Sequence, residues 1–142
     1  MSHTVLIADD SSFIRKALCN VLEREEDFDV CGEAENGREA VEKPQQLHPD
    51  LILIDLSMPV MNGLDATRVL KQLMPEVPVI MFSSYRGSST EKEARTAGAS
   101  ALVSKFEHIS VLISKARRVL EPEELRAFQP RCASMAGKLR HF

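Results

Sequence analysis

Five short apolar runs, rich in β-branched residues and separated by segments of helical periodicity, constrain the fold of this chain more than any other feature. The runs are residues 4–9, 28–34, 50–55, 78–83 and 100–105. The central runs are apolar on every side, as strands of a parallel sheet buried on both faces must be. The alternation therefore predicts an α/β fold, in which a five-stranded parallel sheet has helices on both faces.

The first and last connecting segments have the clearest helical periodicity. Their apolar stripes are Ile14, Ala17, Leu18, Val21 and Leu22 in the first, and Ile109, Leu112, Ile113, Ala116, Val119 and Leu120 in the last. Residues at these spacings lie on one face of a helix. Ser11 and Ser12 are both good N-cap types for the first helix. We therefore expect one helix to begin beside these serines and another to span the last stripe.

Three further segments complete the predicted helices. Asn62 is followed three residues later by Asp65, which resembles a capping box at the start of a helix. The side chains expected to face the core from this helix are Leu70, Leu73 and Met74. Residues 37–47 and 88–97 have weaker stripes. Pro44 lies inside the first of these segments and should kink or shorten it.

The length of 142 residues fits one domain with a modest appendage. We assign residues 1–120 to the domain and residues 121–142 to a C-terminal tail or linker. The apolar residues of this tail that could line one more short helix are Cys132, Met135, Ala136 and Leu139.

Composition argues against several classes of partner. The formal net charge of -3 favours neither nucleic acid nor an anionic membrane. No stretch approaches the ~20 apolar residues of a membrane helix, and the N-terminal apolar run is too short for a signal peptide. The three cysteines form neither a disulfide framework nor a zinc pattern. We expect a cytoplasmic protein without a membrane partner.

Polar residues at the carboxyl ends of the runs carry the functional information. They are Asp9 and Asp10 in the first run, Asp55 in the third, Ser83 and Ser84 in the fourth, and Lys105 in the fifth. Reactive groups in such sheets lie beyond the carboxyl ends of the strands, near the point where the strand order reverses. Taken singly, each residue is more often a cap, a turn residue or solvated surface. Agreement across four strands instead predicts a single site.

This set of residues favours phosphoryl chemistry at a metal ion. Three carboxylates within a few ångströms repel one another unless a cation joins them. Mg²⁺, which prefers oxygen ligands and retains water, is the natural occupant. One carboxylate can then act as a nucleophile and form an aspartyl-phosphate. Lys105 and Ser83 would place positive charge and a hydrogen-bond donor around the phosphoryl oxygens.

At these residues the sequence resembles the response-regulator receiver domains of two-component signalling. The resemblance covers about residues 3–120 and rests on the motifs LIADDS, DLILIDLSMPVMNGLDATRVL, PVIMFSS and AGASALVSK. It implies a doubly wound, flavodoxin-like sheet of order 2-1-3-4-5. It also implies a phosphoacceptor module addressed by a sensor histidine kinase or phosphotransfer protein. Such a module is not an enzyme beyond its own phosphorylation and dephosphorylation. It switches partner or oligomer interactions, homodimerisation included, through its fourth helix, fifth strand and fifth helix.

The resemblance also assigns a role to each site residue. Asp55 is the phosphoacceptor, and Lys105 pairs with the phosphate. The implied metal ligands are Asp9, Asp10, Asp55 and the backbone carbonyl of Ser57. Asp10 would bind Mg²⁺ directly, and Asp9 through water or as a charge partner. Ser83 is the hydroxyl that follows the phosphoryl group on activation.

Three positions depart from the family pattern. The family usually has Tyr or Phe three residues before the lysine, where this chain has Leu102, so the switch is muted or uses another side chain. Phe106 follows the lysine where many receivers have proline. That trait, with the segment DVCGEAENGREAV, is closer in style to receivers of helix-turn-helix transcription factors. Pro44 has no functional explanation.

Three alternative interpretations stay open. The chain could be the N-terminal receiver fragment of a two-component transcription factor whose DNA-binding domain is absent. Residues 121–142 are too short for a helix-turn-helix domain, so we expect no direct nucleic-acid binding by this chain. A phosphatase of the haloacid dehalogenase kind would need an acid where Ser57 stands. The intact site residues disfavour a receiver-like module that no longer takes phosphate, although Leu102 keeps that interpretation open.

Overall fold

β-Strands and α-helices alternate along the whole described chain, as the apolar runs predict. The computed structural model describes residues 2–84, 88–105 and 107–121. The strands are β1 His3–Ala8, β2 Phe28–Ala34, β3 Leu51–Asp55, β4 Val79–Ser83 and β5 Ala101–Ser104. The helices are α1 Ser12–Glu23, α2 Gly37–Leu47, α3 Gly63–Leu73, α4 Ser88–Ala97 and α5 Ile109–Leu120. Every predicted strand is present, and each of its ends lies within one residue of the predicted end.

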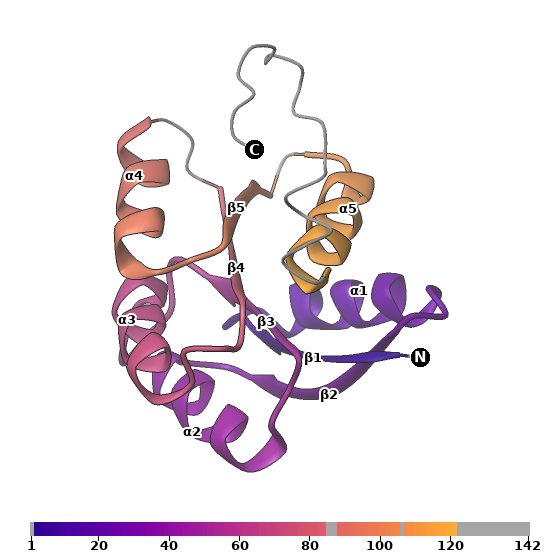
Figure 1. Ribbon diagram of the computed structural model, residues 1–142, viewed down its shortest axis with the longest axis horizontal. Helices are drawn as coiled ribbons and strands as arrows, with labels where there is room; N and C mark the ends of the chain where they lie inside the picture. Colours follow the sequence, from indigo (N-terminus) through magenta and orange to yellow (C-terminus); the bar gives the residue numbers. More distant parts are fainter. Residues whose placement is uncertain (1, 85–87, 106, 122–142) are drawn as a thin grey trace.

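The five strands form one parallel sheet of order β2-β1-β3-β4-β5, so the predicted order is confirmed. Helices α1 and α5 cover one face of this sheet, and α2, α3 and α4 cover the other (Figure 1). The strand order reverses between β1 and β3, because the chain passes from β1 to β2 on one side and then returns to β3 on the other. This reversal places the carboxyl ends of β1 and β3 side by side.

Two apolar layers hold the helices on the sheet. Successive strand residues point to opposite faces, so β3 gives Leu51 and Leu53 to the layer under α1 and α5, and Ile52 and Ile54 to the layer under α2–α4. All four are fully buried. Complete burial of such a side chain contributes about 1.5–3 kcal/mol. Each layer therefore fixes the strand register, because a slip of one residue would exchange the two sets.

The predicted helix starts are confirmed by their caps. The Ser11 hydroxyl accepts a hydrogen bond from the Ile14 N–H at 3.3 Å, and the Asn62 side chain accepts one from the Asp65 N–H at 2.9 Å. Such caps stabilise a helix by about 1 kcal/mol.

One predicted core position is wrong: Leu73, expected to face the core, is 52% exposed. Ala17, which belongs to the apolar stripe of α1, is also exposed. Both lie at the margin of a stripe whose centre is buried, Leu70 in α3 and Leu18 in α1. A period of 3.6 residues turns the margin of a stripe away from a flat sheet, so spacing alone overestimates the width of the buried face.

Pro44 does not shorten α2, which continues to Leu47. Proline has no N–H to donate to the carbonyl four residues earlier, so α2 loses one internal hydrogen bond. The last turn is retained because the His48 N–H donates to the Pro44 carbonyl at 2.8 Å. His48 then ends the helix in the left-handed conformation. The predicted shortening is therefore wrong, and the alternative of a kink stays a prediction.

The last described helix ends at Leu120, next to the predicted boundary between residues 1–120 and 121–142. The division into a domain and a tail stays a prediction, and the short helix predicted after residue 121 lies outside the described residues. Among the helices that the structure describes, none is long and apolar enough to cross a membrane.

Candidate functional site

The carboxyl ends of β1, β3, β4 and β5 converge on one rim of the sheet, where the sequence-predicted residues meet. Asp9 directly follows β1, Asp55 ends β3, Ser83 ends β4, and Lys105 directly follows β5. We call this the acidic rim. The topology explains the convergence, because parallel neighbouring strands all end on the same side.

Three carboxylates gather at the acidic rim. One carboxylate oxygen from each of Asp9, Asp10 and Asp55 lies within 4.8 Å of the other two. Asp9 is fully buried and Asp55 is 4% exposed, whereas Asp10 is exposed. Two of the three charges are thus removed from water. Repulsion between like charges is stronger in these buried surroundings than in water.

The Lys105 ammonium lies between the two buried carboxylates. It is 3.3 Å from an Asp9 oxygen and 3.2 Å from an Asp55 oxygen. It also lies 5.2 Å from the centre of the Phe82 ring, within range of a cation–π contact. The predicted meeting of Lys105 with the carboxylates is present in the structure.

One ammonium does not balance the charge of this site. Burial raises the pKa of the Asp55 carboxyl, and the Asp9 carboxylate raises it further, while Lys105 and the Ser57 N–H offset only part of that rise. Burial alone would lower the pKa of Lys105, but Asp55 and Asp9 outweigh it and the pKa is raised. The folded site therefore has excess negative charge. A cluster of carboxylate oxygens with unbalanced charge fits a hard divalent cation such as Mg²⁺.

Main-chain groups hold both buried carboxylates in place. The Ser11 N–H donates to Asp9 Oδ1 at 2.8 Å, and the Ser57 N–H is 3.4 Å from Asp55 Oδ1. Ser57 is itself exposed at the acidic rim, two residues after Asp55. Its predicted metal-ligating carbonyl stays a prediction.

The two predicted switch residues lie on neighbouring strands. Ser83 is 1% exposed, and its backbone carbonyl accepts a hydrogen bond from the Lys105 N–H at 2.8 Å. Leu102 is partly buried against the apolar layer under α2–α4. Its carbonyl accepts a hydrogen bond from the Lys115 ammonium of α5 at 3.1 Å. Phe106, noted above as a departure, lies outside the described residues.

Sequence reasoning missed Arg15. Its guanidinium donates to the backbone carbonyl of Asp9 at 2.7 Å and to the Glu33 carboxylate at 2.8 Å. The position of Arg15 in the sequence could have indicated a contact with this region. It lies one turn into a helix that starts beside Asp9 and Asp10, so its side chain can reach back to them. Its partner Glu33 lies on β2, and no local spacing indicates that contact.

We expect the shift in Asp55 to appear in the pH dependence of stability. A carboxyl whose pKa is raised by folding destabilises the fold while it is ionised, and this cost is relieved as the pH falls through the folded-state pKa. In Mg²⁺-free buffer, Asp55→Asn should therefore unfold at higher urea concentration than the wild type at pH 7. The difference should narrow as the pH is lowered towards 4.

Asp27→Asn is the matched control for that experiment. Hydrogen bonding to Arg117 lowers the pKa of Asp27, so its ionised form stabilises the fold. This variant should be less stable than the wild type at pH 7, and its deficit should shrink as the pH falls. A stability difference for Asp55→Asn that stays constant or widens on acidification would contradict the assigned cause.

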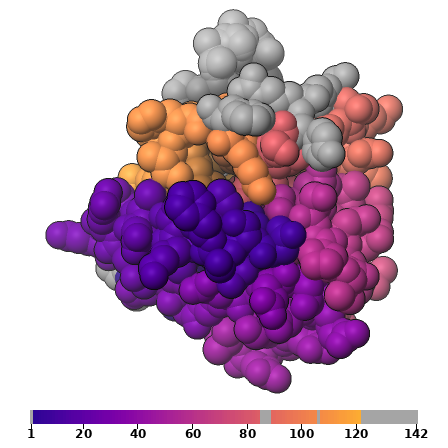
Figure 2. All heavy atoms as spheres, turned by 180° about the vertical axis from the view of Figure 1, so that it is seen from behind, coloured from indigo at the N-terminus to yellow at the C-terminus, as the bar shows by residue number. Residues whose placement is uncertain are grey.

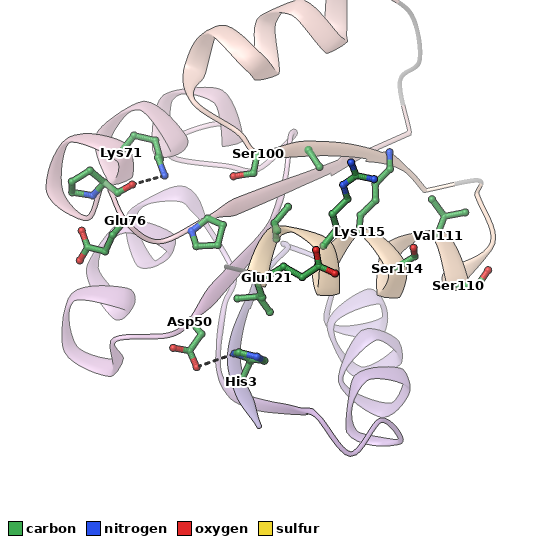
Figure 3. Close-up of a pocket in the computed structure, with 16 residues that line it drawn as sticks. His3, Asp50, Lys71, Glu76, Ser100, Ser110, Val111, Ser114, Lys115 and Glu121 are labelled. Atoms are coloured by element: carbon green, nitrogen blue, oxygen red, sulfur yellow. Dashed lines mark hydrogen bonds and ion pairs between the residues drawn. The ribbon is translucent and has the colours of Figure 1, made fainter. Parts of the chain in front are cut away.

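A second concave surface lies at the amino ends of the strands, opposite the acidic rim. It is an open cleft of about 1230 Å³ between α5 and the starts of β1 and β5, lined by residues that include His3, Ser100 and Lys115 (Figure 3). Seen from behind, the indigo N-terminal residues adjoin the orange residues of α5 (Figure 2). Its charged residues are of both signs: Lys71, Lys115 and Arg118 against Asp50, Glu76 and Glu121. None of the residues predicted to carry chemistry lines it.

The chain is similar to several known proteins. Residues 5–117 match the family model described as the response regulator receiver domain. The chain is 44% identical over 123 residues to a protein-glutamate methylesterase/protein-glutamine glutaminase of Hahella chejuensis, covering 84% of this chain and 31% of that protein. It is 38% identical over 101 residues to the transcriptional regulatory protein LnrK of Bacillus subtilis, covering 71% of this chain and 46% of that protein. The chain thus spans less than half the length of either relative.

Solved structures give the same result. The response regulator domain of Thermotoga maritima CheB is 31% identical, with a TM-score of 0.79, covering 86% of this chain and all of that one (100%). A chain in the CheX–CheY–BeF3–Mg complex from Borrelia burgdorferi is 26% identical, also with a TM-score of 0.79, covering 84% of this chain and 90% of that one.

Proposed function

The chain belongs to the family of response regulator receiver domains, and from that premise we propose that it is a phosphorylation switch with Asp55 as its phosphoacceptor. The observation that carries this proposal is the Lys105 ammonium, within 3.3 Å of oxygens of both Asp9 and Asp55. A buried carboxylate beside an ammonium and two further acids suits nucleophilic attack on a phosphoryl group better than it suits a purely structural ion pair.

We assign the metal site to this chain's own oxygen donors. The proposed ligands are Asp9, Asp10, Asp55 and the backbone carbonyl of Ser57. Asp10 is exposed and suits direct coordination, whereas Asp9 is already occupied by Lys105 and the Ser11 N–H and suits a water-mediated or purely electrostatic role. Bound Mg²⁺ would supply positive charge that neutralises the carboxylates and the incoming phosphoryl oxygens.

Phosphoryl transfer then follows from the placement of the side chains. One Asp55 oxygen donates an electron pair to phosphorus, and the bond from phosphorus to the donor breaks with its electron pair leaving on the donor atom. That atom is the imidazole nitrogen of a phosphohistidine, or the acetate oxygen of acetyl phosphate. Lys105 then pairs with the phosphoryl oxygens, and the Ser83 hydroxyl turns to donate to them.

The partners follow from the same chemistry. The phosphodonor is a sensor histidine kinase or a phosphotransfer protein, and the output is a change in partner or oligomer contacts through α4, β5 and α5. Signalling by acceptance of a phosphoryl group, rather than turnover of a separate substrate, is the activity we assign to this chain. We place it in the cytoplasm, where such donors act.

A second candidate is that the chain is the receiver part of a two-component transcription factor. The match to LnrK, and a structural match to a LuxR-family response regulator from Aurantimonas at 27% identity and a TM-score of 0.82, favour it. Both candidates share the chemistry of the acidic rim and differ only in the output.

Phosphoryl uptake is the test of the proposed function. Incubation of the wild-type chain with acetyl phosphate and Mg²⁺ should add the mass of one phosphoryl group, read by intact mass spectrometry. The same incubation with excess EDTA should add none, because the carboxylates then repel the donor. Failure to gain mass with Mg²⁺, or equal gain in EDTA, would refute the proposal.

A further inference from the structure

One guanidinium contacts the main chain of the acidic rim rather than its carboxylates. Arg15, in the first turns of α1, donates from Nη1 to the backbone carbonyl oxygen of Asp9 at 2.7 Å. Its Nε donates to Glu33 Oε1 at 2.8 Å, and its side chain is 15% exposed. The guanidinium therefore joins the end of β1 to the end of β2 through two charge-assisted hydrogen bonds.

The direction of the Asp9 carbonyl affects the position of Asp10, because this carbonyl belongs to the peptide plane that joins the two residues. A peptide unit is planar, so the direction of its carbonyl oxygen fixes the direction of its N–H and the position of the next Cα. The other groups of Asp9 are also held: its N–H donates to the Ala34 carbonyl, and its carboxylate accepts from Ser11 and Lys105. Asp10, by contrast, makes no hydrogen bond or ion pair with any other residue that the structure describes, so its position depends on this peptide plane.

Glu33 is in turn anchored from a second helix. The Lys43 ammonium of α2 donates to the Glu33 backbone carbonyl at 2.7 Å. Arg15 is therefore held at both ends, by Glu33 on β2 and by its own helix, where its N–H donates to the Ser11 carbonyl at 3.0 Å. A group anchored in this way can fix another group's direction, which a freely rotating surface cation cannot do.

We propose that Arg15 is a positioning residue for the metal site, holding the Asp9–Asp10 peptide so that both carboxylates point at the cation. This inference rests on the proposed function, since it concerns the affinity of the same site for Mg²⁺. Arg15 touches neither the phosphoacceptor nor a phosphoryl group, and acts only through the Asp9 carbonyl.

The charge of Arg15 and its proposed positioning role predict opposite effects of its loss on the affinity for Mg²⁺. A positive charge near a cation site repels the cation, so its removal would strengthen Mg²⁺ binding if electrostatics alone mattered. Loss of the hydrogen bond to the Asp9 carbonyl frees the peptide plane and would weaken binding. Groups that orient metal ligands typically change metal affinity by about 10–100-fold when removed. The sign of the effect therefore separates the two mechanisms.

The experiment is a calorimetric titration of Mg²⁺ alone into the full chain. Arg15→Met, which is neutral and of similar length, should bind Mg²⁺ about 10-fold more weakly than the wild type. Arg15→Lys keeps the charge but cannot bridge both acceptors, and should also bind more weakly. At saturating Mg²⁺, phosphoryl uptake from acetyl phosphate should return close to the wild-type rate in both variants, because the reacting groups are unchanged.

Arg117→Met is the matched control. Arg117 also bridges two carboxylates, Glu25 at 2.6 Å and Asp27 at 2.9 Å, but from α5 and away from the acidic rim. Its loss should leave Mg²⁺ affinity unchanged, and thermal unfolding without Mg²⁺ identifies any general loss of structure in each variant.

Mg²⁺ binding by Arg15→Met that equals or exceeds wild-type binding would overturn the inference and leave the proposed function standing. So would wild-type affinity in a folded Arg15→Lys. Absence of Mg²⁺ binding and of phosphoryl uptake in the wild type itself would overturn both.

Discussion

Replacing Asp55 with asparagine is expected to abolish phosphoryl uptake, lowering its rate by at least about a thousandfold. Asparagine has nearly the same shape, but its amide oxygen is uncharged and a poor nucleophile. Asp9 cannot substitute, because it is fully buried and both of its carboxylate oxygens are already occupied by Ser11 and Lys105. Asp10 is exposed and lies on another strand end, off the central strand that Asp55 terminates.

Intact mass after incubation with acetyl phosphate and Mg²⁺ measures this effect. Asp29→Asn is the control, because Asp29 is an exposed aspartate of β2. This variant should take up phosphate at the wild-type rate. Stoichiometric labelling of Asp55→Asn at Asp9, Asp10 or a serine would show that the nucleophile is another residue.

Gly63→Ala is expected to destabilise the chain by about 3 kcal/mol. Gly63 begins α3 directly against β3, and its N–H donates to the Leu56 carbonyl at 2.7 Å. A Cβ at this position would overlap the backbone carbonyl of Asp55 and come within 2.9 Å of the Leu56 Cα. Both obstacles are main-chain atoms, so the helix or the end of β3 has to move. The same movement would shift Asp55, the proposed phosphoacceptor.

Gly32→Ala is the matched control for this substitution. A Cβ at Gly32 would meet Leu47 Cδ1 at 2.6 Å, which is the tip of a side chain that is 43% exposed and free to turn aside. We expect it to cost less than about 1 kcal/mol. Urea denaturation in Mg²⁺-free buffer measures both variants. Equal free energies of unfolding for Gly63→Ala and Gly32→Ala would show that α3 accommodates the methyl group without displacing β3.

The strands and the acidic rim could be predicted from sequence because each is encoded locally. An all-apolar run such as residues 51–54 has no stable place except between two layers, and the polar residue that ends it marks the rim. The caps at Ser11 and Asn62 are equally local, since donor and acceptor lie three residues apart.

The features that sequence did not predict depend on contacts between distant segments. Glu33 lies 18 residues after Arg15 in the chain. Arg15 acquires its role only because β2 brings Glu33 beside the end of β1. The exposure of Leu73 depends on where the sheet lies relative to α3. The helical periodicity of the sequence carries no information about that position. The tolerance of Pro44 depends on its place in the last turn of α2, where a single hydrogen bond is lost.

The direction of α5 has a consequence for anything that follows this domain. The helix starts four residues after Lys105. It ends at the opposite side of the sheet, beside the cleft that Glu121 helps to line. Its 12 residues span about 18 Å at the usual rise of an α-helix. A segment joined after residue 121 is thus attached far from Asp55, the proposed phosphoacceptor, although α5 connects it to the end of the sheet at which Asp55 lies. Small rotations of α5 about its contacts with β5 would move the attached segment most, so the end of α5 is where the proposed phosphorylation of Asp55 would have its largest mechanical effect.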